Sequence, residues 1–161
     1  MTTLLAPALL AVCLFILQGT LLSGLQLDLI TPLVVYVTLE SNLAAALLFA
    51  VGLGFLTDTM SGAVAGLNIA LNLGVLAIAR LVRDHLMLGS LLVRVGVASV
   101  GLVTRAILYM CLTALLLGWA PTGSTAVAMA VQVVGGTLIS LPMFALLDLA
   151  LESFSLRQQS L

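Results

Sequence analysis

Ionisable and amide side chains inside apolar stretches are the residues of this sequence best suited to chemistry. Asp58, Asn68, Asn72 and Arg105 all stand among Leu, Val, Ala, Ile and Gly. Such groups can form ion pairs and hydrogen bonds or contact a ligand, and each is costly to bury without a partner. We therefore expect them to meet one another, or a partner, inside the fold.

Arg105 is the most demanding of these residues. It follows Arg94 by 11 positions, which corresponds to about 16 Å along a helix. A charged residue at the centre of a bilayer costs at least about 2.5–3.5 kcal/mol on insertion scales. Two interpretations remain open, a structural ion pair and a pocket or partner contact. The candidate internal partners are Asp58 and Asp148.

Asp58 ends an apolar run, and the turn residues Ser61, Gly62 and Gly66 follow it. Aspartate accepts hydrogen bonds from backbone N–H groups in turns and at helix starts. We expect Asp58 to cap the next helix, with a direct partner or ligand contact as the alternative. Gly62 and Gly66 form a G-x-x-x-G pattern, which is typical of close helix packing.

Asn68 and Asn72 are one helical turn apart and predict a ladder of hydrogen bonds between helices, with a ligand site as the alternative. Near the end of the last apolar run, Asp148 and Glu152 are also one turn apart. We expect them to form ion pairs, and a proton relay is the alternative. The candidate partners are Arg80, Arg83 and Arg94.

Catalytic and metal-binding patterns are not visible in the sequence. His85 is the only histidine and stands in a polar stretch, so we expect it to be solvated. Cys13 and Cys111 lie in apolar runs, which predicts small buried side chains rather than a disulfide or metal ligands. We expect no catalytic residue, no metal and no cofactor, and hence a protein that is not an enzyme.

The composition indicates which elements must position these groups. Of 161 residues, 63% are hydrophobic and 7% are charged, and the mean hydropathy is +1.34. Soluble domains carry about a quarter charged residues, so the surface of this chain must face lipid. The net charge of −1 gives no basis for nucleic-acid binding. The sequence predicts an all-α, polytopic protein with a single integral membrane domain, residues 1–161.

Six apolar segments divide the chain, and about 17–25 residues are needed to span a bilayer. The first is expected to be a retained helix, because it lacks the basic start and cleavage site of a secretory signal. The second and third are short, so residues 29–57 either span twice or form a broken, re-entrant hairpin. Pro142 is expected to kink the last segment. The segments are Leu4–Leu22, Leu29–Leu39, Leu43–Thr57, Gly66–Ala79, Leu91–Leu117 and Thr125–Leu151.

The arginines predict the orientation of the chain. With six spans, Arg80, Arg83, Arg94 and Arg157 fall on one side of the membrane, and the opposite loops carry no Arg or Lys. Because cytoplasmic loops are rich in basic residues, both termini are expected to be cytoplasmic.

Residues 50–68, AVGLGFLTDTMSGAVAGLN, resemble the signature stretch of the bacterial rod shape-determining MreD family. That family shows a glycine-rich span that ends in an acidic residue, followed by Ser-Gly and then Gly-Leu. Here these positions are Gly54, Asp58, Ser61-Gly62 and Gly66-Leu67. Chain length and segment number also match. One departure is that Asp28 stands four residues before Pro32, where the family usually has a proline–aspartate pair.

The resemblance implies a non-enzymatic scaffold of the cell-elongation complex in the bacterial inner membrane. It would bind the transmembrane helix of MreC and support side-wall peptidoglycan synthesis, together with RodA, its transpeptidase and MreB. The family is similar in fold to the substrate-binding subunits of energy-coupling-factor transporters, so a vitamin-capturing membrane subunit is the alternative. That alternative needs a cavity lined by aromatic and polar groups. Few aromatic residues are candidates to line it, namely Tyr36, Tyr109 and Trp119.

Overall fold

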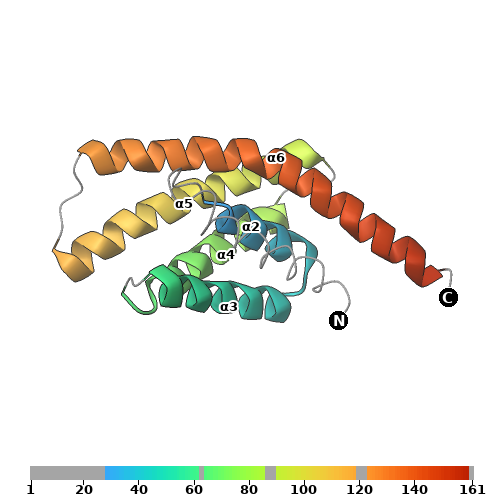
Figure 1. Cartoon of the computed structure of the whole chain (residues 1–161), viewed down its shortest axis with the longest axis horizontal. Coiled ribbons are helices and arrows are strands. Elements are labelled where there is room, and N and C mark those ends of the chain that lie inside the picture. Colours follow the sequence, from blue (N-terminus) through green and yellow to red (C-terminus); the bar gives the residue numbers. More distant parts are fainter. Residues whose placement is uncertain (1–27, 62–63, 86–89, 119–122, 160–161) are drawn as a thin grey trace.

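Every element in the described part of the chain is an α-helix, which confirms the all-α part of the predicted fold class. The computed structural model describes residues 28–61, 64–85, 90–118 and 123–159. In Figure 1, α2 lies in the middle of the molecule, with α3 and α4 on one side and α5 and α6 on the other. The predicted segment Leu4–Leu22 lies outside the described residues. The helices are α2 (Ile30–Glu40), α3 (Leu43–Ser61), α4 (Leu67–His85), α5 (Leu91–Leu117) and α6 (Gly123–Gln159).

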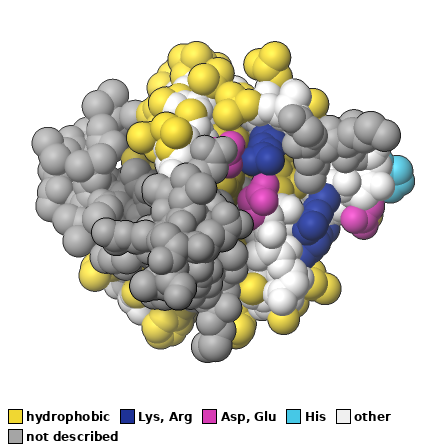
Figure 2. All heavy atoms as spheres, turned by 90° about the vertical axis from the view of Figure 1, so that its right-hand side faces the viewer, with side chains coloured by type: hydrophobic (Ala, Val, Ile, Leu, Met, Phe, Trp, Pro, Cys, Tyr) yellow, Lys and Arg dark blue, Asp and Glu magenta, His cyan; other side chains and the backbone are white. Residues whose placement is uncertain are grey.

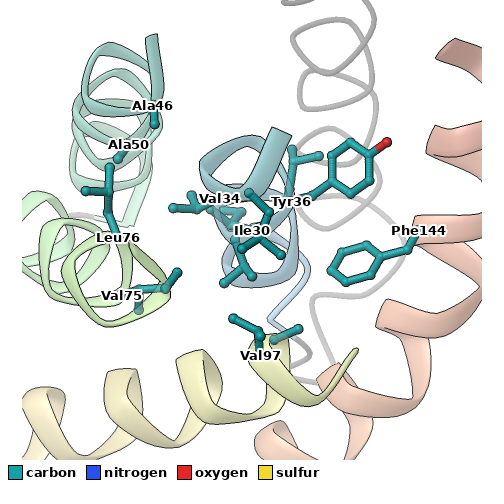
Figure 3. Packing of buried hydrophobic residues seen from close by; sticks show 14 of the residues in the cluster. Ile30, Val34, Tyr36, Ala46, Ala50, Val75, Leu76, Val97 and Phe144 are labelled. Carbon is teal, nitrogen blue, oxygen red and sulfur yellow. The ribbon is translucent and has the colours of Figure 1, made fainter. Parts of the chain in front are cut away.

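Helix α2 forms the core of the bundle. Every residue from Ile30 to Leu39 is buried, including the hydroxyl-bearing Thr31 and Thr38. A helix that is apolar on all sides must be enclosed by other elements or by lipid, and here protein encloses it. Figure 3 shows this packing, in which α2 lies between α3 and α4 on one side and Phe144 of α6 on the other.

Three of the described helices are long and apolar enough to cross a membrane. They lie in α3, α5 and α6, as Leu43–Met60, Leu91–Leu116 and Gly123–Leu149, each with a mean hydropathy of 1.8. The 11 residues of α2 extend only about 16 Å, about half the hydrocarbon thickness. Helix α4 carries two asparagines and three charged residues, which lower its hydropathy. The count of six spans is therefore not supported in the described part.

The surfaces of the three long helices are apolar, as expected of a membrane protein. Leu48 is 76% exposed and Leu115 is 81% exposed, and large aliphatic side chains are exposed along all three helices. Continuous apolar surface of this extent is uncommon on soluble monomers. Cys111 belongs to this exposed surface, so the expectation that it is buried was wrong. Cys13 lies outside the described residues.

The segment 29–57 forms two helices joined by a two-residue turn, and only the second is long enough to span a membrane. After α2 ends at Glu40, Ser41 and Asn42 turn the chain directly into α3. The Asn42 side chain accepts a hydrogen bond from the Ala45 N–H at 2.9 Å, which caps the start of α3. Helix α2 is too short to span, whereas α3 is long enough.

Helices α3 and α4 approach each other closely at Gly54. A Cβ atom at this position would lie 2.6 Å from the backbone Cα of Ile69, so no larger residue fits without moving a helix. A Cβ atom at Gly52 would meet nothing within 4 Å. The close approach of the two helices therefore depends on Gly54 and not on Gly52. In the last helix, Pro142 lies inside α6, which changes direction along its length in Figure 1.

Candidate functional site: two polar clusters at the ends of α2

Asp28 begins the first cluster by capping the N-terminus of α2. Its Oδ1 atom accepts hydrogen bonds from the backbone N–H groups of Ile30 and Thr31, each at 3.1 Å. Its Oδ2 atom accepts the Thr31 hydroxyl at 2.6 Å. A carboxylate here satisfies the unpaired N–H groups of the first turn and opposes the positive end of the helix dipole.

Arg105 of α5 binds the same carboxylate. Its Nε atom lies 3.0 Å from Asp28 Oδ2, and both side chains are largely buried. Its two terminal nitrogens donate to the side-chain oxygens of Asn72 at 2.7 Å and Asn68 at 2.9 Å. The predicted partners, Asp58 and Asp148, were therefore wrong. Asp28 takes the role because the start of α2 lies directly beside α5.

Asp58 closes the turn between α3 and α4. Its carboxylate accepts the Gly66 N–H at 2.9 Å, the Asn68 N–H at 3.0 Å and the Asn68 side-chain amide at 2.9 Å. Gly66 has a φ of +91°, a left-handed conformation that favours glycine. The expected capping role of Asp58 is confirmed. Ser61 is the last residue of α3, but its side chain and the whole of Gly62 lie outside the described residues.

The two asparagines of α4 connect Arg105 to Asp58 and to the backbone of α3. Asn72 donates to the Ala50 carbonyl of α3 at 3.2 Å while it accepts from Arg105. Asn68 contacts Asp58 and Arg105 together, so the predicted hydrogen-bond ladder between helices is confirmed. We call Asp28, Asp58, Asn68, Asn72 and Arg105 the inner cluster. Each of its members bonds within the chain, so the cluster joins α2, α3, α4 and α5.

A second group of polar side chains lies at the C-terminal end of α2 and includes two residues of that helix. Arg94 Nη1 lies 3.1 Å from Glu40 Oε1 and 3.1 Å from Asp148 Oδ1. The Tyr36 hydroxyl donates to Asp148 Oδ1 at 2.7 Å, and the Tyr36 ring packs on Phe144 with centroids 5.4 Å apart. We call Tyr36, Glu40, Arg94 and Asp148 the outer cluster. Glu40 and Asp148 are about 40% exposed.

The expected pairing of Asp148 with a nearby arginine is therefore confirmed for Arg94. The side chain of Glu152 lies outside the described residues. His85 is exposed, as expected. Figure 2 looks onto this end of the molecule and shows basic and acidic side chains close together, with apolar surface beside them.

Two further arginines bind the last carbonyl groups of α2. Arg80 Nη2 donates to the Ser41 carbonyl at 2.9 Å, and Arg83 Nη1 donates to the carbonyls of Ser41 at 3.1 Å and Thr38 at 3.3 Å. Cations are favourable at the negative end of a helix dipole. These contacts place Arg80 and Arg83 at the end of the bundle where α2 ends and α3 begins.

An apolar groove of about 330 Å³ lies between α5 and α6. Small side chains from both helices leave it open, namely Ala106, Ala126 and Ala130, while Met110 and Met129 add flexible walls. The polar clusters do not contribute to its lining. The groove can accept an apolar helix or acyl chains but offers no group for acid–base chemistry.

The sequence interpretation missed three members of the clusters. Asp28 was considered only as a departure from the family pattern, although an aspartate directly before an apolar helix is an ordinary capping signal. Tyr36 and Glu40 gave no local signal, because their partners come from α5 and α6. Within the described residues, no three His, Cys, Asp or Glu side chains lie close enough to hold a metal ion.

Comparison of the chain with family models, with curated proteins and with solved structures gave no match in any of the three. The resemblance to the MreD family therefore depends on the motif residues alone.

Proposed function

We propose that this chain is a non-enzymatic membrane scaffold of the bacterial cell-elongation complex, which binds the transmembrane helix of MreC. The observation that carries the proposal is the division between interior and surface. The inner cluster is bonded within the chain, while the long helices expose large apolar side chains. A partner that lies in the bilayer would meet these apolar faces.

The groove between α5 and α6 is the surface that best fits such a partner. In lipid, hydrophobic driving force between helices is small, so association depends on close packing against small residues. Three alanines line this groove and would let a partner helix approach the backbones of α5 and α6. The proposed partner contact thus lies away from the motif residues around Asp58. The Asp58 carboxylate forms its hydrogen bonds within the turn between α3 and α4.

The proposal includes an orientation in the bacterial inner membrane. Arg80, Arg83 and Arg94 lie at one end of the bundle, and the rule that basic residues stay inside would place this end in the cytoplasm. RodA, its transpeptidase and MreB are further proposed partners of the assembly. Six spans with both termini in the cytoplasm would require residues 1–27 to supply the first segment. They would also require the chain to cross the membrane at α2, whose 11 helical residues are too few to span by themselves.

The alternative function, a vitamin-capturing subunit similar to those of energy-coupling-factor transporters, requires a cavity within the bundle. In the described part of the chain, α2 fills the centre, and its Val35 and Tyr36 side chains are at most 1% exposed. This filled centre favours the scaffold over the transporter subunit.

Filling the groove tests the scaffold proposal. Ala130→Leu adds three carbon atoms inside the groove, whereas Val131→Leu changes an exposed neighbour that does not line it. Overpacking costs about 1–3 kcal/mol, so Ala130→Leu should reduce co-purification with MreC on the order of tenfold. The Val131→Leu control should leave it unchanged. Equal recovery of MreC with both variants, and normal rod shape, would remove the groove from the proposal. If MreC does not co-purify with the wild-type chain, the scaffold function itself fails.

A further inference from the structure

Arg80 and Arg83, near the end of α4, differ from Arg94 and Arg105 in the groups that they contact. Arg94 and Arg105 each have a carboxylate within 3.1 Å. Arg80 and Arg83 bond to backbone carbonyls, and among the described residues no carboxylate forms an ion pair with either of them. Within the described residues, their two positive charges therefore have no acidic partner.

The two guanidinium groups converge on a single point. Both donate to the Ser41 carbonyl oxygen, so like charges lie side by side. Capping the end of α2 uses only one nitrogen of each group, although each guanidinium has five N–H donors. The two guanidinium groups therefore keep N–H donors that can bind another acceptor. The most complementary acceptor for paired guanidinium groups is a phosphate.

The surroundings of the pair indicate which phosphate would bind. Arg80 and Arg83 are half-buried, while Leu81, between them in sequence, is 60% exposed. Leu43, two residues after the shared carbonyl of Ser41, is 52% exposed. Cations at helix ends beside exposed leucines match a lipid, which has a charged head and apolar chains. An acidic soluble peptide would leave these leucines uncovered.

We propose that Arg80 and Arg83 form a binding site for the phosphate headgroup of an anionic phospholipid, with its acyl chains against the exposed leucines beside them. The bound headgroup would supply the missing negative charge at the end of the bundle where α2 ends and α3 begins. The site is independent of the α5–α6 groove and of the proposed partner.

Native mass spectrometry of the full chain in detergent measures this binding directly, with phosphatidylglycerol and phosphatidylcholine as probes. One basic residue near an anionic surface is worth about fivefold in affinity, so Arg80→Gln/Arg83→Gln should bind phosphatidylglycerol about 25-fold more weakly. The charge-retaining Arg80→Lys/Arg83→Lys variant should stay within about threefold of wild type, since lysine also binds phosphate. Arg157→Gln, which removes a charge from the end of α6, should match wild type.

Three results would overturn the proposal. The first is equal binding of phosphatidylglycerol and phosphatidylcholine, and the second is an equal loss in the Arg157→Gln control. The third is displacement of the lipid by millimolar inorganic phosphate or by an acidic peptide, which would identify a free anion or a protein as the ligand. If the double glutamine variant does not fold, Arg83→Gln replaces it, with an expected loss of about fivefold. A single variant that binds phosphatidylglycerol like wild type would overturn the proposal equally.

Discussion

The two ends of α2 solve the same physical problem in different environments. At the N-terminal end, the negative charge of Asp28 stabilises the positive end of the helix dipole. At the C-terminal end, the positive charges of Arg80 and Arg83 stabilise the negative end. The inner cluster is largely enclosed, with Asp28 and Arg105 side chains 11% and 17% exposed. The outer cluster is more open, since Glu40 is 42% exposed.

This difference sets the energetic importance of the two ends. A buried charge that loses its partner keeps its desolvation cost, whereas a partly exposed charge can be solvated by water or lipid headgroups. Helix α2 is about 16 Å long, so its N-terminal end, at the inner cluster, lies far from the charged end of the bundle. We infer that the inner cluster contributes most of the free energy that holds α2 in its position, and that the outer cluster contributes less.

Removal of Arg105 should have the largest effect. Arg105→Met removes the ion-pair partner of the Asp28 carboxylate and the donor to two asparagine oxygens, so the free energy of unfolding should fall by about 3–5 kcal/mol. Unfolding by denaturing detergent in mixed micelles measures this loss. The double variant Asp28→Asn/Arg105→Met removes the unpaired charge and should be more stable than the single variant by at least about 1 kcal/mol. If the double variant is no more stable than the single one, the ion pair is not the cause.

A smaller effect is expected beside the inner cluster, where α3 and α4 touch. Gly54→Ala places a methyl group 2.6 Å from the backbone of Ile69, which should cost about 1–3 kcal/mol of unfolding free energy. Gly52→Ala is the matched control, because it lies two residues away on α3 and meets open space. Alanine is the better helix former by up to about 1 kcal/mol, so the control should be as stable as wild type or more stable. Equal losses in both variants would show that the close approach is not tight.

Much of the candidate site could be predicted where the partners are local or where few partners exist. Asp58 lies at the turn before α4, so capping chemistry was sufficient to predict that it caps this helix. Asp148 had few basic partners to choose from, and Arg94 was among those expected. The ion pair between Asp28 and Arg105 was missed because it joins distant segments, and periodicity does not tell which helix packs on which.

The fold was predicted less well for a related reason. Apolar composition does not distinguish a helix that faces lipid from one enclosed by other helices, and α2 is the second kind. Its length was the available signal, since 11 residues fall well below the number needed to span a bilayer. The exposed side of Cys111 likewise depends on which face of α5 meets α6, which sequence alone does not specify.

The smallest effect should come from Glu40 in the outer cluster. Glu40→Gln removes a carboxylate that binds Arg94, and Asp148 remains. Exposed ion pairs contribute about 0.2–1 kcal/mol, and salt screens them. We therefore expect a small loss of unfolding free energy at low salt that disappears at high salt, whereas the loss in Arg105→Met should persist because its ion pair is buried. A Glu40→Gln loss as large as that of Arg105→Met, at either salt concentration, would contradict the assignment of the position of α2 to its inner end.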